Sequence, residues 1–233
     1  KFEGFWFKTG TPTFLTKLIQ QRNFQINWLE EVSVKGEIFD KYEISTLELI
    51  PLLFQTGYLT IKNYNFSTQE YTLSYPNNEV RLSFNIHLLS ALSDKTMGEN
   101  AMLLNDIRQS LLKNDIEKFI LLLQILFKGI TYPLIDDKEN YYHSIFYLVI
   151  KLLGFDIETE VLTCDGRIDA VIKCTNTIYV IEFKLGTAQS AIEQIQKKQY
   201  QLKYQNDGKQ IVLLGIGFDT ELKNIGDYQM LIG

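Results

Sequence analysis

The sequence predicts an α/β protein in which a mostly helical α+β region precedes a mixed sheet flanked by helices. Two observations lead to this fold class: the hydrophobic period changes along the chain, and the last hundred residues alternate helical and strand patterns. The 233 residues, 45% hydrophobic and 13% aromatic, exclude a disordered chain and suit one large domain or two small ones. We place a domain boundary near residue 130, which gives domains at 1–130 and 131–233.

The first ninety residues mix short helical and strand patterns. A helix is predicted after Thr13, which is placed to cap it, and a capping box at 45–48 opens a second helix through Leu53. Residues 58–62 and 70–74 then alternate as strands joined by a polar loop. A helix followed by such a hairpin has the outline of a winged-helix-like module, although no helix with a basic face accompanies it.

Helical patterns fill residues 93 to about 130. The stretch 97–113 is amphipathic, whereas 115–127 is apolar nearly all round, as expected of a buried helix. The last hundred residues follow the order α-β-β-β-α-β. The predicted elements are a helix at 139–153, strands at 157–163, 167–173 and 177–184, a helix at 188–204 and a strand at 211–216.

Composition narrows the classes of function. The net charge is −5, so no strong global field attracts nucleic acid or a membrane surface. No run approaches the roughly 18 apolar residues of a membrane-spanning helix, and no secretory signal opens the chain, so we predict a cytoplasmic protein without a membrane partner. Cys164 and Cys174 are interpreted as reduced core thiols. The absence of an initiator Met suggests a fragment of a longer protein.

Three charged residues stand in predicted strands where an apolar core would not place them. Asp169 lies in the second strand of the last hundred residues, and Glu182 and Lys184 lie on one face of the third. A turn at 174–177 can bring Asp169 beside Glu182. Two converging carboxylates form a hard oxygen site suited to Mg²⁺ or Mn²⁺, and the Phe183 carbonyl can add a third oxygen.

Such a site has the components of metal-assisted phosphodiester hydrolysis. The ion would polarise the phosphodiester and lower the pKa of a water, and Lys184 would orient that water or stabilise the developing negative charge. The alternative is structural, because a Glu-x-Lys triplet is common by chance and Asp169 can pair with Arg167 or Lys184. The combination of the Asp strand, the Glu-x-Lys strand and helices on either side favours a site of nuclease type, active or decayed.

These residues resemble a known family. The run 166–169 (Gly-Arg-Ile-Asp) followed by 181–184 (Ile-Glu-Phe-Lys) resembles the core motif of the PD-(D/E)XK nuclease superfamily, which has a restriction-endonuclease-like fold. Further segments resemble the C-terminal nuclease-like domain of bacterial proteins that begin with an AAA-ATPase-like domain. These segments are 139–143, 191–200 and 214–218, and the resemblance covers about residues 133–220.

The front of the chain resembles the end of the ATPase-like region of the same proteins. The segments that carry this resemblance are 5–15 and 55–61. No Gly-x-x-x-x-Gly-Lys-Ser/Thr loop occurs in the 233 residues. The resemblance therefore implies that the nucleotide-binding core lies before Lys1 and that this chain alone does not hydrolyse ATP.

The resemblance also implies roles for single residues. Asp169 and Glu182 would bind the metal and Lys184 would be the catalytic lysine. Glu139, on the helix before the sheet, matches an acidic residue that completes the metal site in many relatives, although it can equally be part of a solvated helix start. His143, one turn later, can reach the same cleft or be a packed helix residue.

The helix after the third strand carries the expected substrate contacts. Gln194 and Tyr200 match a Gln and a Tyr kept there by related nucleases, although Gln196 also has the i, i+4 spacing to Tyr200 and either Gln can be a surface residue. The clearest basic cluster is Lys197, Lys198, Lys203 and Lys209. Because residues 131–233 carry 10 Lys+Arg and 14 Asp+Glu, we expect weak intrinsic affinity for nucleic acid.

The leading hypothesis is an Mg²⁺- or Mn²⁺-dependent nuclease domain coupled to an AAA-ATPase-like domain of the same protein. The alternative is an inactive nuclease-like fold that serves as a nucleic-acid-binding or regulatory module. A purely structural α/β domain is a third and remote option. The expected partners are nucleic acid, with DNA favoured over RNA, the ATPase-like domain, and a second copy at the sheet edge.

Overall fold

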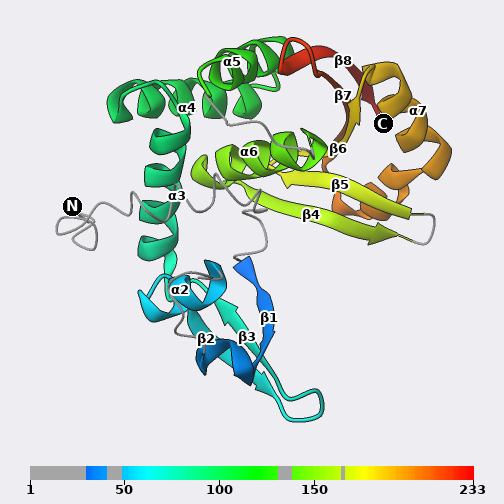
Figure 1. Cartoon of the computed structure of the whole chain (residues 1–233). Coiled ribbons are helices and arrows are strands. Elements are labelled where there is room, and N and C mark those ends of the chain that lie inside the picture. The colour runs from blue at the N-terminus through cyan, green and yellow to red at the C-terminus, as the bar shows by residue number, and fades with distance from the viewer. Residues whose placement is uncertain (1–29, 41–48, 131–137, 164–165) are drawn as a thin grey trace. The chain divides into compact units, whose positions relative to one another are not determined.

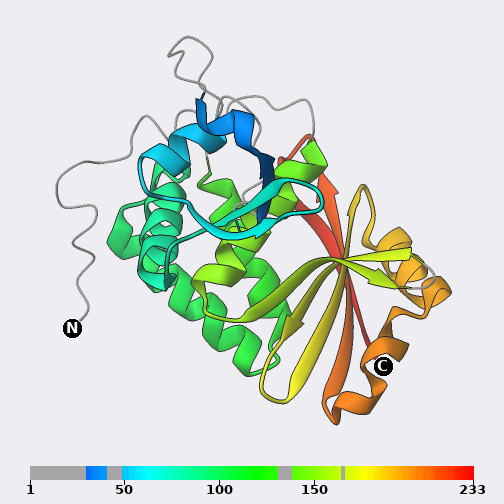
Figure 2. The same cartoon turned by 90° about the horizontal axis from the view of Figure 1, so that it is seen from below.

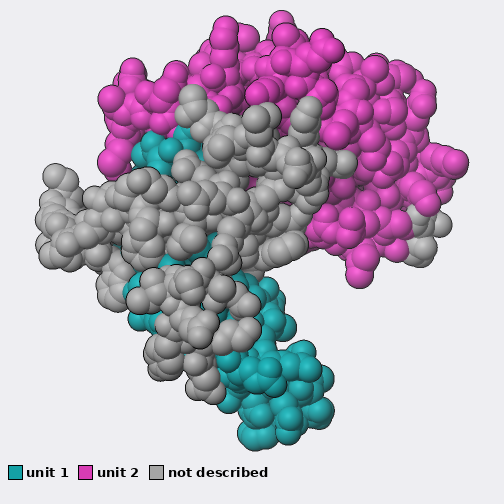
Figure 3. Space-filling view, viewed as in Figure 1, with its two compact units in different colours: residues 1–92, 132–134 teal, residues 93–131, 135–233 magenta. Residues whose placement is uncertain are grey.

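A computed structural model describes residues 30–40, 49–130, 138–163 and 166–233. Contacts divide the chain into two compact units, residues 1–92 with 132–134 and residues 93–131 with 135–233 (Figure 3). The helix predicted after Thr13 and the resemblance at 5–15 lie outside the described residues. No helix in the described ranges is both long and apolar enough to cross a membrane.

The first unit is a small antiparallel sheet with helices. Its elements are β1 (Val32–Lys35), η3 (Gly36–Asp40), α2 (Leu49–Gln55), β2 (Thr60–Asn65), β3 (Glu70–Ser74) and α3 (Asn78–Leu92), and the strand order is β1-β3-β2. Leu53, Leu73, Phe84 and Leu88 are fully buried in its core. The predicted hairpin corresponds to β2 and β3. The second predicted helix overlaps α2, which extends two residues beyond the predicted end at Leu53, and the capping box at 45–48 lies outside the described residues.

The second unit is a five-stranded mixed sheet between two layers of helices. Its elements are α4 (Met97–Leu112), α5 (Ile116–Lys128), α6 (Lys138–Leu152), β4 (Asp156–Thr163), β5 (Gly166–Lys173), β6 (Thr177–Leu185), α7 (Ala188–Lys198), η5 (Tyr200–Asp207), β7 (Gln210–Asp219) and β8 (Asn224–Ile232). The strand order is β4-β5-β6-β7-β8, and β6 and β7 are parallel whereas the other pairs are antiparallel. The prediction of a mixed α/β fold is confirmed.

The sheet is covered on both faces, with α4, α5 and α6 on one side and α7 with η5 on the other (Figures 1 and 2). On the first side the Tyr142 ring stacks on Phe218 at 4.2 Å, and Phe146 contacts Phe183 at 4.9 Å. On the second side Ile192 and Ile195 of α7 join the buried residues of β6 and β7. Burial on both faces explains why the β6 sequence is almost continuously apolar.

The predicted boundary near residue 130 differs from this division, because α4 and α5 group with the C-terminal sheet. The Gln124 amide donates to the Ile225 carbonyl at 2.9 Å, and the Asn224 amide donates to the Gln124 carbonyl at 3.0 Å. The Tyr179 hydroxyl donates to the Leu111 carbonyl at 3.0 Å. Buried and part-buried hydrogen bonds therefore connect both helices to strands that follow them by 65 residues or more in the sequence.

The helix predicted over 188–204 is interrupted. Gln199 takes a left-handed conformation with φ of 49° and ends α7, and the chain continues as the 3₁₀ helix η5. The break turns Tyr200 and Tyr204 into the core, where both are buried. The last strand of the sheet, β8, was not predicted from the sequence.

Candidate active site

The pairing of β5 with β6 ends where the charged residues begin. The main-chain ladder extends from Lys173 opposite Ile178 to Ala170 opposite Ile181. One residue beyond it, a carboxylate oxygen of Asp169 (Oδ2) accepts the Phe183 N–H at 2.9 Å. The Asp169 side chain thus takes a main-chain donor of β6 at the point where the ladder stops. This contact fixes the Asp169 carboxylate at the end of the ladder.

Glu182 lies beside this point with its side chain toward α7. Glu182 is only 1% exposed. Its Oε1 accepts hydrogen bonds from the Lys184 ammonium at 3.3 Å and from the Gln194 side-chain amide. The other oxygen, Oε2, is buried and has no hydrogen-bond partner among the described residues. A buried acceptor without a partner costs about 1–3 kcal/mol, and more if it is charged. Glu182 therefore presents an unsatisfied oxygen inside the site.

In the absence of a cation, the surroundings of Asp169 and Glu182 disfavour the ionised form of both carboxyl groups. Burial raises the pKa of Asp169, and the Phe183 N–H and the Lys184 ammonium partly oppose that rise. Burial, followed by the negative charge of Asp169, raises the pKa of Glu182 to about 8. Lys184 lowers both pKa values without offsetting the burial. An additional positive charge at this place would stabilise both carboxylates.

These donors fit a hard divalent ion. Mg²⁺ binds through one or two carboxylates and keeps several water ligands, so Asp169, Glu182 and the open Oε2 match its usual protein contribution. The part of the chain that is described contains no group of three or more His, Cys, Asp or Glu side chains able to hold a metal. Further ligands would therefore be main-chain oxygens such as the predicted Phe183 carbonyl, water, or the predicted Glu139, whose side chain lies outside the described residues.

Two glycines allow α7 to pack directly over the charged end of β6. Gly215 and Gly217 of β7 lie opposite Glu182 and Lys184 in the parallel ladder. A Cβ on Gly215 would come within 2.7 Å of the Ala188 carbonyl, and one on Gly217 would overlap the Gly186 carbonyl. The close approach brings the first turns of α7 over the sheet, and Gln194 reaches Glu182 from there.

The first turn of α7 is also held by β8. A carboxylate oxygen of Asp227 (Oδ1) accepts the Ala188 N–H at 3.0 Å, so a side chain from the last strand satisfies a helix N-terminal donor. Gly215, Gly217 and Asp227 were not among the site residues predicted from the sequence. A Gly-x-Gly pair within an otherwise apolar strand was the available signal for a close backbone approach.

The residues predicted to bind substrate lie in different environments in the structure. Gln194 contacts Glu182, whereas Gln196 is exposed. The hydroxyl of Tyr200 donates to the Arg167 carbonyl at 2.9 Å, and Tyr200 is therefore attached to the beginning of β5. Of the two predicted lysines, Lys197 is exposed and Lys198 lies half-buried beside the beginning of β5.

The two predicted residues of α6 have different outcomes. The His143 ring lies 4.7 Å from the Phe183 ring, and Phe183 belongs to the face of β6 covered by α6. His143 thus packs on the face of β6 opposite to the side chain of Glu182. Glu139 lies within the described span of α6, but its side chain is outside the described residues, so its role remains a prediction.

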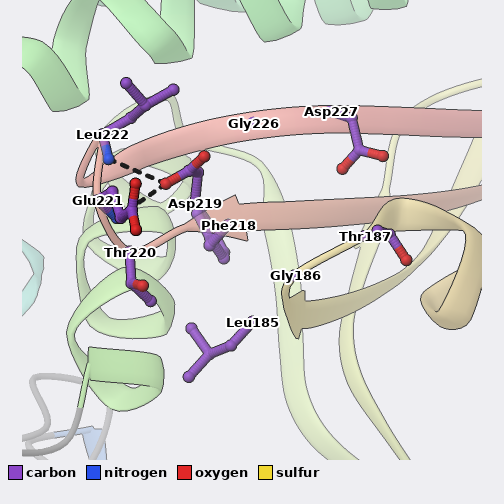
Figure 4. Close-up of a pocket in the computed structure, with 10 residues that line it drawn as sticks. All are labelled: Leu185, Gly186, Thr187, Phe218, Asp219, Thr220, Glu221, Leu222, Gly226 and Asp227. Atoms are coloured by element: carbon purple, nitrogen blue, oxygen red, sulfur yellow. Dashed lines mark hydrogen bonds between the residues drawn. The ribbon is translucent and has the colours of Figure 1, made fainter.

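A cavity of about 620 Å³ begins immediately after Lys184, at Leu185–Thr187, and extends to the loop between β7 and β8 (Figure 4). Its walls carry three carboxylates, those of Asp219, Glu221 and Asp227. Asp219 accepts the Glu221 and Leu222 N–H groups at 2.8 and 2.9 Å, which fixes the loop. The carboxylates make this cavity unfavourable for a phosphate group.

Comparisons with known proteins agree with the motif. Residues 137–228 match the family model described as the PD-(D/E)XK nuclease superfamily, so a domain of that superfamily is found in the second unit. A protein of Azotobacter chroococcum mcd 1, described as "Uncharacterized protein in vnfD 5'region", is 33% identical over 238 aligned positions. The alignment covers 97% of this chain and 45% of that protein, so the chain spans less than half of the relative's length. No solved structure matches the chain.

Proposed function

We propose that the second unit is a divalent-metal-dependent nuclease domain of restriction-endonuclease-like topology, in which α6-β4-β5-β6-α7-β7 is the αβββαβ core. The observation that carries the proposal is the unpartnered, buried Oε2 of Glu182 beside Asp169. A protein that used these groups only for stability would gain by replacing the buried carboxylate with an apolar side chain. A bound cation would use the carboxylates of Asp169 and Glu182 as ligands.

Each residue of the site has a separate task. Asp169 and Glu182 hold Mg²⁺ or Mn²⁺, and the Asp169 contact to the Phe183 N–H fixes the position of one ligand. The ion, when bound, supplies Lewis-acid polarisation of the phosphodiester and a lowered pKa for an attacking water. The Lys184 ammonium holds the water in place or stabilises the charge that develops on the phosphoryl oxygens. Gln194 orients Glu182 by donating to its Oε1.

An inactive nuclease-like domain that binds nucleic acid or regulates a neighbouring domain is the second candidate. The observation that favours it is charge: the acidic cavity beside the site and the excess of acidic residues in 131–233 both oppose phosphate binding. Metal binding without cleavage would support this alternative. Its ligand, like the substrate of the proposed nuclease, would be a nucleic acid, with DNA favoured.

We also propose a larger context for the chain. Residues 1–130 would be the C-terminal part of an AAA-ATPase-like region, with a winged-helix-like module around α2, β2 and β3. The whole protein would be a cytoplasmic bacterial one in which the ATPase-like domain delivers or gates the nucleic acid. A second copy could pair at an edge of the five-stranded sheet, formed by β4 or β8.

A cleavage assay tests the proposal. The chain is incubated with single- and double-stranded DNA and RNA in Mg²⁺ or Mn²⁺, alongside Asp169→Asn, Glu182→Gln and Lys184→Met. Glu193→Gln is the matched control, because Glu193 is an exposed carboxylate on α7 that contacts Gln189. We expect metal-dependent cleavage that falls about 100-fold or more in each site variant, typical of lost acid–base or electrostatic groups, and remains intact in the control.

The metal is measured separately by Mn²⁺ titration calorimetry. Binding that disappears in Asp169→Asn, together with no cleavage by the wild-type chain, would favour the inactive alternative. If the wild-type chain binds no Mn²⁺ and cleaves no substrate, both the metal site and the nuclease function are wrong.

A further inference from the structure

Three cations lie around the β4–β5 hairpin and the end of α7, next to the candidate active site. We call them the basic stripe and define it as Arg167, Lys198 and Lys203. Gln194, which contacts Glu182, and Lys198 are one helical turn apart and therefore share a face of α7. The stripe thus begins one turn away from the residue that orients a proposed metal ligand.

The stripe lies along the β4–β5 hairpin. A Cβ on Gly166 would lie 3.8 Å from the Lys198 ammonium, which places that charge at the beginning of β5. The Lys203 ammonium donates to the Leu162 carbonyl of β4 at 3.3 Å. Between them, the Tyr200 hydroxyl binds the Arg167 carbonyl. The end of α7 and η5 therefore hold both strands of the hairpin, with two lysines on the same side.

Most of the positive charge of the basic stripe is not neutralised by acidic side chains of the described residues. Arg167 forms an ion pair with Glu160, but its side chain remains 56% exposed. Lys198 and Lys203 form no ion pair with any acidic side chain in the described ranges, and Lys203 donates only to the Leu162 carbonyl. By contrast, Lys173 on the same hairpin is paired with Glu158. Two ammonium groups are thus available to a ligand that carries negative charge.

The distance to the site fits an extended polyanion. Gly166 and Asp169 are three residues apart on β5, which corresponds to about 10 Å of strand. This equals about three nucleotides of a B-form strand, which rises about 3.4 Å per nucleotide along its axis. The aromatic rings of the same surface, Tyr200 and Tyr204, are buried, so base stacking is not offered here. The available contacts suit phosphates and not bases.

We propose that the basic stripe binds the phosphodiester backbone of nucleic acid, independently of sequence, and guides one strand to Asp169 and Glu182. The inference rests on the proposed nuclease function for its direction. It explains how an acidic unit can engage nucleic acid, because the phosphates meet a local row of cations and avoid the acidic cavity beyond Lys184. It also assigns Arg167 and Lys203, which the motif comparison does not place near substrate.

Salt-dependent binding tests the stripe without requiring catalysis. The full chain carrying Asp169→Asn is titrated in EDTA against a fluorescent 30-nucleotide DNA, single- or double-stranded, at several salt concentrations. The test variant adds Lys198→Gln and Lys203→Gln. The matched control adds Lys118→Gln and Lys128→Gln, which remove the same charge from exposed lysines of α5 on the other side of the sheet.

The expected result is a smaller salt slope. Each lost phosphate contact lowers the slope of log K against log salt by about 0.9 for duplex DNA or about 0.7 for a single strand. Between 50 and 200 mM salt, loss of two duplex contacts makes the affinity of the test variant fall about tenfold less than that of its parent. The control should keep the parent slope with either form of DNA.

The outcomes separate this inference from the proposed function. An unchanged slope in the test variant, or an equal change in the control, would overturn the basic stripe even if the wild-type chain cleaves nucleic acid. Undetectable binding by the parent would overturn it as well. A reduced slope together with no cleavage by the wild-type chain would support the stripe while rejecting the nuclease function. Arg167→Gln should give a further, smaller decrease, because Glu160 already neutralises part of its charge.

Discussion

Replacing Glu182 with glutamine should stabilise the metal-free protein at alkaline pH. The carboxyl of Glu182 is buried, and its pKa is raised to about 8 from an ordinary value of 4.5, chiefly by burial and next by the charge of Asp169. Between these two pH values the folded state holds a proton that the unfolded state has released. Stability therefore falls as pH rises from about 4.5 to 8 and stays low above that range. Glutamine keeps the shape of the neutral acid and has no proton to lose.

The magnitude follows from the size of this rise. One pKa unit corresponds to about 1.4 kcal/mol, so the full difference sets a ceiling of about 5 kcal/mol at pH 9. The variant loses the attraction between Glu182 and the Lys184 ammonium, which is one-third exposed and can be solvated instead. We expect a net gain of roughly 2–4 kcal/mol at pH 9 and almost none near pH 4.5.

Calorimetric unfolding in EDTA provides the measurement. Both tryptophans, Trp6 and Trp28, precede the second unit in the sequence, so heat absorption is a better probe of that unit than fluorescence. For a unit of this size each kcal/mol moves the midpoint by about 2–4 °C, so the variant should unfold roughly 4–16 °C higher than wild type at pH 9. Glu193→Gln, which neutralises an exposed carboxylate, should change it little at either pH.

Adding Mg²⁺ completes the comparison. The ion should raise the midpoint of the wild-type protein at pH 9, because it binds only the folded arrangement of Asp169 and Glu182, and it should raise that of Glu182→Gln much less. A stability difference that is the same at pH 5 and pH 9 would refute the assignment of a raised pKa to Glu182. A variant less stable than wild type at pH 9 would show that the carboxylate is well accommodated without a cation.

Three further predictions follow from neighbouring contacts. Tyr200→Phe removes the hydrogen bond to the Arg167 carbonyl and should lower the free energy of unfolding by about 1 kcal/mol, measured by urea denaturation. Gly215→Ala places a Cβ within 2.7 Å of the Ala188 carbonyl and should cost about 1–3 kcal/mol in the same assay; a neutral result would mean that α7 can shift freely. Burial raises the pKa of the Cys174 thiol to about 11, so it should react with a disulfide reagent at pH 8 only after unfolding, and rapid reaction of the native protein would contradict its burial.

Periodicity predicted the strands of the second unit well because most of them are buried on at least one face. The apolar run of β6 and the alternation around it locate the strand that carries Glu182 and Lys184. The charged residues were visible because they interrupt this pattern. Their meeting with Asp169 could be expected from the short turn between β5 and β6, which brings residues 13 apart in sequence to one edge of the hairpin.

The remaining features depend on tertiary contacts that no local pattern carries. The chain turns at Gln199, which adopts the left-handed conformation usually taken by Gly or Asn. Because a glutamine does not signal such a turn, the sequence predicted one continuous helix through Tyr204. The grouping of α5 with the second unit rests on side chains such as Gln124, which binds β8 a hundred residues later. Which glutamine faces the site was undecided in sequence because Gln196 also has the i, i+4 spacing to Tyr200, and the structure places Gln194 against Glu182.

The contact between Asp169 and the Phe183 N–H gives one residue two roles, and two substitutions can separate them. Asparagine keeps an oxygen that can accept this N–H, whereas alanine leaves a main-chain donor of β6 unpaired at a cost of about 1–3 kcal/mol. Both variants lose a charged metal ligand. We therefore expect Asp169→Asn and Asp169→Ala to lose Mn²⁺ binding alike, measured by calorimetry, while only Asp169→Ala unfolds at lower urea concentration. Equal stability of the two variants would mean that the carboxylate does not end the ladder, and Mn²⁺ binding retained by both would remove Asp169 from the metal site.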